Sequence, residues 1–225
     1  MRIALALILV AGCVDAVLGQ DPNPKRWEPT IAGFEAHDRE KPPPADPIVF
    51  TGSSSIARWK GIATAFPEFP VLNRGFGGSV TPDLLHYFDR VVLAYKPKVI
   101  VFYCGSNDLA SKRSPEQVIG DFRSFVKMTH EKLPGTKIAY ISQHVPPSRV
   151  KLSAGYAEVN RAVRADAAKD ETLRFVDIHD KMLGNDGAPN EELYAADRLH
   201  PNEAAYKIWA DELRAVLKAA YGPSR

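Results

Sequence analysis

The feature that most constrains the fold is an alternation, from residue 48 onward, of short apolar runs with longer amphipathic stretches. The runs are rich in β-branched residues and have no alternating polar face, which is typical of strands buried on both sides. Helical stretches between such strands indicate crossover connections and a parallel sheet. We therefore predict an α/β fold, a three-layer α/β/α sandwich of flavodoxin-like type around a five-stranded parallel sheet. The expected strands cover 48–51, 71–73, 99–103, 137–142 and 173–176, and the expected helices cover 81–95, 115–133, 154–169 and 203–221.

Length and charge further limit the classes of protein to which the chain can belong. A chain of 225 residues with 45% hydrophobic and 25% charged residues suits one globular domain with a full core. No repeat or linker divides residues 28–225, which we take as that domain. The formal charge of +2, without a long run of Lys or Arg, does not indicate a basic surface of the kind that binds nucleic acid. We expect no nucleic-acid partner.

The N-terminus has the pattern of an export signal over residues 1–19: a basic start, an apolar stretch too short to span a bilayer, and small residues. Val10–Cys13 resembles a bacterial lipobox, in which the cysteine is lipidated, and cleavage after Gly19 is the competing possibility. The chain is thus expected to be exported, either to the bacterial cell envelope, periplasmic or lipid-anchored through Cys13, or as a secreted protein.

Proline shapes the next segment, because seven of the eighteen prolines lie between residues 22 and 47. Proline inside a helix removes a hydrogen bond, so no long helix can run through this region. We expect a tether over 20–27 and a short helix over 28–40 on the edge of the domain. After processing, Cys104 has no intramolecular disulfide partner.

Polar residues gather directly after the predicted strands. In open parallel sheets, ligands bind outside the carboxyl ends of the strands, so these segments should meet at one edge. Each segment alone has a plainer explanation as a turn, a helix cap or a solvated surface pair. The segments are Gly52–Ser55, Asn73–Gly78, Gly105–Asp108 and Asp197–Pro201.

Nucleophilic catalysis accounts for this grouping. A serine hydroxyl needs a histidine to take its proton, and the histidine needs a carboxylate to orient it. Asp197 and His200 can supply both from one turn, and Pro201 keeps His200 out of helical geometry. A tetrahedral intermediate further needs hydrogen-bond donors at its oxyanion. A glycine N–H after the second strand, an asparagine amide after the third and the serine's own N–H are suitable donors.

The four segments together resemble the SGNH hydrolases, the GDSL-type esterases and lipases. The resemblance implies Ser54 as nucleophile, Asp197 and His200 as its partners, and an oxyanion hole formed by Ser54, Gly78 and Asn107. It implies no cofactor and no metal. Ser53 stands where the family usually has aspartate, which leaves open that Ser53 or Ser55 carries the reaction instead.

A metal site at the same edge is the rival arrangement. His144 and His179 follow predicted strands and lie near Asp177 and Asp180 in the sequence. Their spacing fits no familiar zinc pattern. We expect His144 to be a pocket-edge or packing residue.

The resulting prediction is a serine esterase that hydrolyses short-chain acyl esters, acetyl esters above all, on carbohydrates or other polar alcohols. The two longer connections, 143–153 and 177–197, are polar and contain few large apolar residues, so they should form a shallow rim rather than a lid. The alternatives are a lipase or lysophospholipase-type acyl hydrolase, and a non-catalytic carbohydrate-binding envelope module on the same fold.

Overall fold

A five-stranded parallel sheet forms the centre of the protein, of which the computed structural model describes residues 23–222. The strand order is β2-β1-β3-β4-β5, and every neighbouring pair is parallel. The chain therefore reverses its direction across the sheet between β1 and β3, the place where ligands bind in such folds. The strands are β1 (Ile48–Gly52), β2 (Val71–Gly75), β3 (Val99–Tyr103), β4 (Lys137–Ile141) and β5 (Leu173–Val176).

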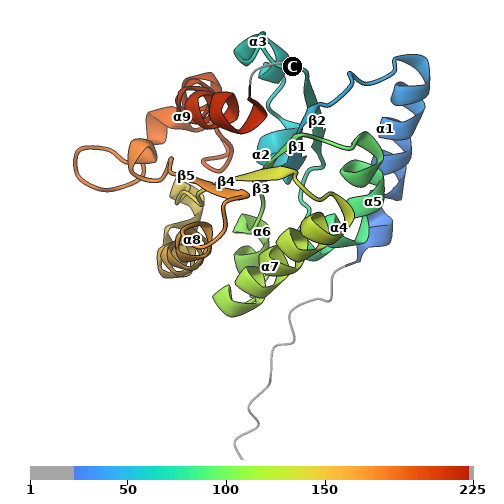
Figure 1. Cartoon of the computed structure of the whole chain (residues 1–225). Helices are drawn as coiled ribbons and strands as arrows, with labels where there is room; N and C mark the ends of the chain where they lie inside the picture. Colours follow the sequence, from blue (N-terminus) through green and yellow to red (C-terminus); the bar gives the residue numbers. More distant parts are fainter. Residues whose placement is uncertain (1–22, 223–225) are drawn as a thin grey trace, which may run out of the picture.

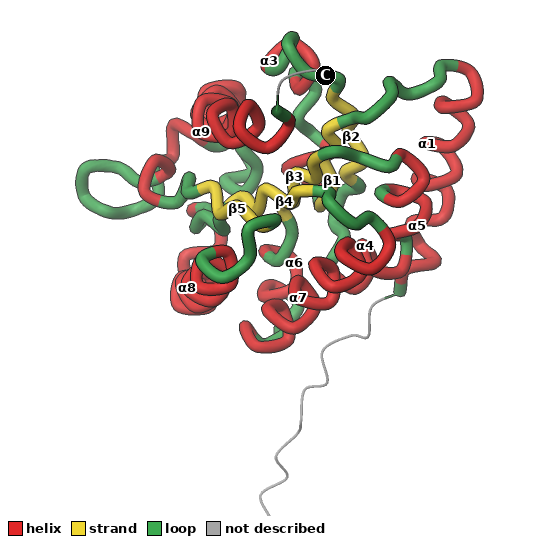
Figure 2. The backbone as a smooth tube through the Cα atoms, viewed as in Figure 1, coloured by secondary structure: helices red, strands yellow, loops and turns green. Residues whose placement is uncertain are grey.

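Helices cover both faces of this sheet (Figures 1 and 2), which confirms the predicted three-layer fold. One face carries α1 (Glu28–Glu40), α4 (Thr81–His86), α5 (Phe88–Val91), α7 (Pro115–Lys132) and α8 (Ser153–Ala167). The other carries α2 (Ser54–Ala57), α3 (Ile62–Ala65) and α9 (Glu203–Tyr221). A further short helix, α6 (Ser106–Ala110), follows β3.

The central strand β3 shows why the apolar runs do not alternate. Ile100 and Phe102 belong to the core under α7 and α8, whereas Val99, Val101 and Tyr103 belong to the core under α9. Successive side chains of a strand point to opposite faces, so a strand between two helical layers must be apolar at every position. All five residues of β3 are buried.

The expected helix over 81–95 is instead divided into α4, α5 and the 3-10 turn η2 (Leu93–Tyr95). The division falls at Tyr87, whose backbone leaves helical geometry at φ −96° and ψ 10°. The Tyr87 hydroxyl donates a hydrogen bond to the Pro24 carbonyl at 2.9 Å. This contact ties the helical region to the start of the described chain. Further 3-10 turns cover η3 (Pro147–Leu152), η4 (Asp180–Met182) and η5 (Glu191–Leu193).

The segment before α1 packs against the domain. Of the expected tether over 20–27, residues 24–27 form the 3-10 turn η1 (Pro24–Trp27), which continues directly into α1. Trp27 packs edge-on against Phe76 with ring centroids 5.8 Å apart, and its indole N–H donates to Asp83 Oδ2 at 2.9 Å. An aromatic side chain with both an apolar contact and a hydrogen bond is well anchored. The export signal and Cys13 lie outside the described residues.

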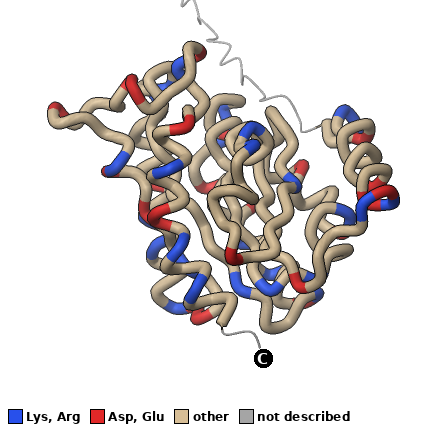
Figure 3. The backbone as a smooth tube through the Cα atoms, turned by 90° about the horizontal axis from the view of Figure 1, so that it is seen from above, with Lys and Arg blue, Asp and Glu red and all other residues tan. Residues whose placement is uncertain are grey.

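Lys and Arg positions are interspersed with Asp and Glu positions over the described chain (Figure 3). Within residues 23–222, none of the helices combines the length and the apolar character needed to cross a membrane.

Candidate active site

The first part of the site is the turn from β1 into α2. Gly52 has φ +147°, and a Cβ at this position would lie 2.1 Å from the Tyr103 carbonyl oxygen. Only glycine allows β1 to approach the end of β3 this closely. The chain then enters α2 with Ser54 as its first residue. In the described part of the chain, the Ser54 N–H has no hydrogen-bond partner, as is usual at a helix start.

The structure brings the three predicted triad residues together. Ser54 Oγ lies 2.7 Å from His200 Nε2, and His200 Nδ1 lies 2.7 Å from Asp197 Oδ2. Asp197 Oδ1 accepts hydrogen bonds from the backbone N–H groups of Leu199 at 3.1 Å and His200 at 3.0 Å. The carboxylate therefore fixes both the backbone turn and the imidazole ring. With Nδ1–H donating to Asp197, Nε2 is the acceptor that faces the serine hydroxyl.

Asp197 is held in its ionised form. Partial burial alone would raise the pKa of this carboxyl, but hydrogen bonds from the backbone and ring of His200 and from the Leu199 N–H outweigh it. The pKa of Asp197 thus lies well below its usual range. Arg58 adds a further contact from α2's C-terminal end, with Nη1 3.1 Å from Asp197 Oδ2. An ionised carboxylate is what stabilises an imidazolium that forms during proton transfer.

The second part of the site is the loop after β2, which contains Gly78. This glycine has φ +78°, and a Cβ here would lie 3.3 Å from the Trp27 ring. Within residues 23–222, the Gly78 N–H has no hydrogen-bond partner. Arg26 donates to the Gly78 carbonyl at 3.3 Å, so the turn η1 contacts this loop through two side chains.

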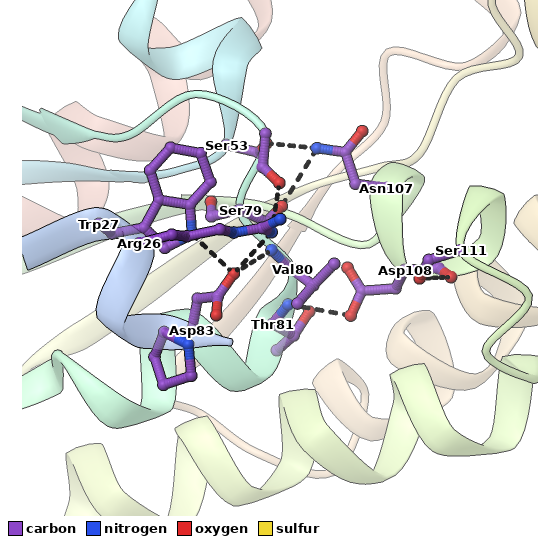
Figure 4. A network of polar contacts seen from close by, with 12 residues as sticks. Arg26, Trp27, Ser53, Ser79, Val80, Thr81, Asp83, Asn107, Asp108 and Ser111 are labelled. Atoms are coloured by element: carbon purple, nitrogen blue, oxygen red, sulfur yellow. Dashed lines mark hydrogen bonds and ion pairs between the residues drawn. The ribbon is translucent and has the colours of Figure 1, made fainter. Parts of the chain in front are cut away.

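Two buried carboxylates hold the loop in place (Figure 4). Asp83 Oδ2 accepts from the Val80 N–H at 3.1 Å as well as from Trp27, and Asp108 Oδ1 accepts from the Thr81 N–H at 2.9 Å. Burial raises the pKa of Asp108 to about 6, against the opposing effects of the Thr81 N–H and the Arg113 charge. The loop is thereby connected to η1 on one side and to α6 on the other.

The third part of the site is Asn107 in α6. Its amide Nδ2 donates to Ser53 Oγ at 2.8 Å and to the Ser79 carbonyl at 3.1 Å. Its Oδ1 accepts from Arg149 Nη2 at 3.0 Å, and Arg149 Nη1 donates to Ser106 Oγ at 2.7 Å. Sequence reasoning missed Arg149, because this residue lies in the polar connection 143–153, and nothing in its surrounding sequence distinguishes it from a solvated arginine.

These parts enclose a small pocket of about 20 Å³, which has room for roughly one water-sized group. Its wall combines the site residues with apolar surface. The lining residues are Ser53, Ser54, Ser55, Tyr103, Cys104, Ser106, Asn107, His144, Pro146, Arg149, Leu199 and His200.

The histidines considered for a metal site make other contacts in the structure. His144 is buried, stacks on Tyr103 with ring centroids 5.8 Å apart, and lies with Nδ1 2.9 Å from the Tyr194 hydroxyl. Burial lowers the pKa of His144 to about 3, so its ring is neutral near pH 7. His179 Nδ1 lies 3.3 Å from the Gln143 carbonyl. Across residues 23–222, no three His, Cys, Asp or Glu side chains are grouped to hold a metal ion.

Comparison with protein families identifies the chain. The model of the GDSL-like lipase/acylhydrolase family matches residues 43–208, which include all four segments of the site. The chain belongs to the GDSL-like lipase/acylhydrolase family. The predicted family and the prediction of a carboxylic ester hydrolase are thereby confirmed. No curated protein matches the chain.

Solved structures share the fold of this GDSL-like acylhydrolase at low sequence identity. One, provisionally described as a platelet activating factor from Streptococcus pneumonia, has a TM-score of 0.75 at 20% identity, covering 86% of this chain and 94% of its own. A GDSL-like lipase from Bacteroides thetaiotaomicron VPI-5482 has a TM-score of 0.67 at 22% identity, covering 88% and 98%. A variant of an acetyl-xylooligosaccharide esterase from Geobacillus stearmophilus has a TM-score of 0.58 at 20% identity, covering 81% and 99%.

Proposed function

We propose that this GDSL-like acylhydrolase is a serine esterase that removes short acyl groups, acetyl above all, from polar alcohols such as carbohydrates. Ser54 Oγ attacks the ester carbonyl while His200 Nε2 takes its proton, and the protonated His200 then donates that proton to the leaving alcohol. Water hydrolyses the acyl-enzyme by the same steps. The observation that carries the proposal is the continuous chain of 2.7 Å contacts from Ser54 through His200 to Asp197.

Charge on the tetrahedral intermediate needs donors that are already in position. The N–H groups of Ser54 and Gly78 are free of partners within the described residues, and both belong to turns that border the nucleophile. The Asn107 side chain, at the same pocket, supplies the side-chain part of this stabilisation.

The size of the pocket favours a small acyl group. A space of about 20 Å³ beside Ser54 accommodates a methyl group, whereas a long acyl chain needs a deep apolar groove. Arg149 and the Ser106 hydroxyl make one side of the pocket polar, which suits an alcohol with several hydroxyl groups. One structural neighbour is described as an acetyl-xylooligosaccharide esterase, in line with this substrate class.

Two variants test the assignment of the nucleophile. Ser54→Ala should lower kcat for p-nitrophenyl acetate by at least ~10³-fold while the protein stays folded, because loss of a triad member has this effect in other serine hydrolases. Ser124→Ala, at an exposed position of α7, is the matched control, and Ser55→Ala tests the alternative nucleophile. Near-normal turnover by Ser54→Ala would show that the nucleophile is elsewhere.

Acyl-chain preference is tested with p-nitrophenyl acetate, butyrate and octanoate below their aggregation concentrations. We expect kcat/KM to be highest for acetate and to fall with chain length. A maximum at octanoate would overturn the short-acyl part of the proposal and would favour the lipase alternative.

A further inference from the structure

Arg149 is a half-buried cation in the wall of the pocket that contains Ser54 and His200. Its Nη1 donates to Ser106 Oγ at 2.7 Å, and its Nη2 donates to Asn107 Oδ1 at 3.0 Å. A guanidinium has five N–H groups, so three of those of Arg149 have no hydrogen-bond acceptor within residues 23–222. These three groups are available to a ligand.

The charge of Arg149 has no counterion in the described part of the protein, because none of the carboxylates there forms an ion pair with it. Three other arginines beside the site do have such a partner. They are Arg26, which pairs with Asp83, Arg58, which pairs with Asp197, and Arg198, which pairs with Glu191. A charge that is partly withdrawn from water and left unpaired costs free energy, and a bound anion would recover part of that cost.

The guanidinium is held in place without a ligand. Arg149 lies at a break in η3, where its backbone leaves helical geometry at φ −128° and ψ 25°. The Ser148 N–H donates to the Arg198 carbonyl at 3.0 Å, which bonds this loop to the turn of the triad. Ser106 Oγ, which accepts from Arg149, also lies 2.9 Å from the Tyr156 hydroxyl. Because loop and side chain are both fixed, a ligand would not have to order this arginine.

The shape of the pocket assigns Arg149 to the alcohol part of an ester. The space beside Ser54, of about 20 Å³, has room for little more than a methyl group, so the alcohol must extend toward the rim. His144 is 1% exposed and belongs to the inner wall, whereas Arg149 keeps exposed surface and belongs to the rim.

We propose that Arg149 binds a carboxylate on the alcohol part of the substrate, so that the enzyme prefers acetyl esters of acidic sugars to those of neutral sugars. A planar guanidinium matches a carboxylate through two parallel hydrogen bonds, a geometry that lysine lacks. One cation balances the single charge of a carboxylate, whereas a phosphate dianion would need a second. The inference rests on the proposed esterase function and narrows its substrate class.

The contact with Asn107 gives Arg149 an effect on every substrate. The bond to Oδ1 holds the amide with Nδ2 toward Ser53 and Ser79 (Figure 4). Loss of the guanidinium would therefore disturb the part that Asn107 has in the oxyanion hole, with charged and uncharged substrates alike. Comparison of two substrates within each variant removes this common effect, because it cancels in the ratio of their kcat/KM values.

The matched substrates are the methyl glycosides of glucuronic acid and of glucuronamide, each carrying one acetyl group at O-2, O-3 or O-4. The two sugars have nearly the same shape, and only the acid is charged. With the wild-type protein, initial rates of acetate release should give a kcat/KM about 10- to 100-fold higher for the acid in at least one isomer, mainly through KM. A charge-assisted bidentate contact has an effect of about this size.

Variants of Arg149 test whether this residue causes the preference. Arg149→Met should bring the ratio to within about twofold of one and should lower kcat for both sugars. Arg149→Lys keeps the charge without the bidentate geometry and should keep only part of the preference. Lys151→Met, at an exposed cation of the same turn η3, is the matched control and should leave the ratio unchanged. Circular dichroism and thermal unfolding show whether each variant is folded.

Failure of this inference is distinct from failure of the esterase proposal. If the wild type releases acetate but prefers the acid in none of the three isomers, Arg149 does not bind a carboxylate and the esterase assignment stands. A preference that persists in Arg149→Met, or that Lys151→Met removes equally, would belong to the general field of the surface and would also overturn the inference. If no acetate ester is hydrolysed faster by the wild type than by Ser54→Ala, both proposals fail.

Discussion

The buried carboxyl of Asp108 leads to a quantitative prediction about stability and pH. Asp108 is 0% exposed, and burial raises its pKa to about 6, whereas an aspartate in the unfolded chain titrates near 3.9. Between these two values the folded protein keeps a proton that the unfolded chain has lost. Stability conferred by the protonated carboxyl is therefore present at low pH and decreases as the pH rises from about 4 to about 6.

The size of this decrease follows from the two pKa values. A difference of roughly two pH units, at about 1.4 kcal/mol for each unit, corresponds to about 3 kcal/mol. Asp108→Asn removes the titration but keeps an oxygen that can accept from the Thr81 N–H. The unfolded carboxyl is already about half ionised at pH 4, so the free energy of unfolding of the Asp108→Asn variant, relative to that of the wild type, should rise by about 2 kcal/mol between pH 4 and pH 7.

Urea unfolding monitored by tryptophan fluorescence, at steps from pH 4 to pH 7.5, measures this difference. Other carboxyls titrate alike in both proteins, so their effects cancel in the comparison. Asp211→Asn, at an exposed position of α9, is the matched control. A difference between wild type and Asp108→Asn that does not change with pH would refute the reasoning. A change of opposite sign would mean that Arg113 and the Thr81 N–H outweigh burial.

The remaining predictions concern the triad, the loop after β2 and the N-terminus. Asp197→Asn should lower kcat by about 10³ to 10⁴-fold with little change in fold, because the amide cannot stabilise the imidazolium; retention of most activity would contradict the triad. Trp27→Ala should lower the free energy of unfolding by about 2 kcal/mol and also lower kcat, because Trp27 contacts Gly78 and Asp83. Thermal unfolding measures the first effect and steady-state kinetics the second. A loss of stability without any change in kcat would show that η1 does not influence the site. In a bacterial host, the chain with its full signal should fractionate with membranes, and Cys13→Ala should release the protein from the membrane fraction, as expected for a lipidated cysteine. A mature N-terminus at Gln20 in soluble material would instead indicate cleavage after Gly19.

Local sequence patterns predicted most of the sheet and the long helices. β3, β5, α1 and α9 have the bounds expected from apolar periodicity, because these elements bury residues at regular spacing. The same reasoning missed the break at Tyr87. The contact of Tyr87 with Pro24 joins residues 63 positions apart, and no local signal records it.

In the site, too, the residues placed by local sequence were predicted, and those placed by distant contacts were not. Residues that follow strands were found from their positions, since all parallel strands end at the same edge. Arg149 was not found, because its contact with Asn107 joins residues 42 positions apart. The raised pKa of Asp108 could not be found either, since an aspartate after an asparagine reads equally well as a helix cap or as a buried acid. Burial of a polar residue depends on what the rest of the chain places around it.

The contact between Ser54 and His200 joins positions 146 residues apart, the first directly after β1 and the second beyond β5, the last strand of the sheet. Enzymatic activity therefore reports completion of the whole fold, not the presence of a stable portion of it. A refolding protein that has formed β1 to β4 without the turn that carries His200 would have much of its secondary structure and hydrolyse nothing. Recovery of turnover should accordingly lag behind recovery of far-UV circular dichroism, and the length of that lag measures how late the C-terminal part of the chain docks.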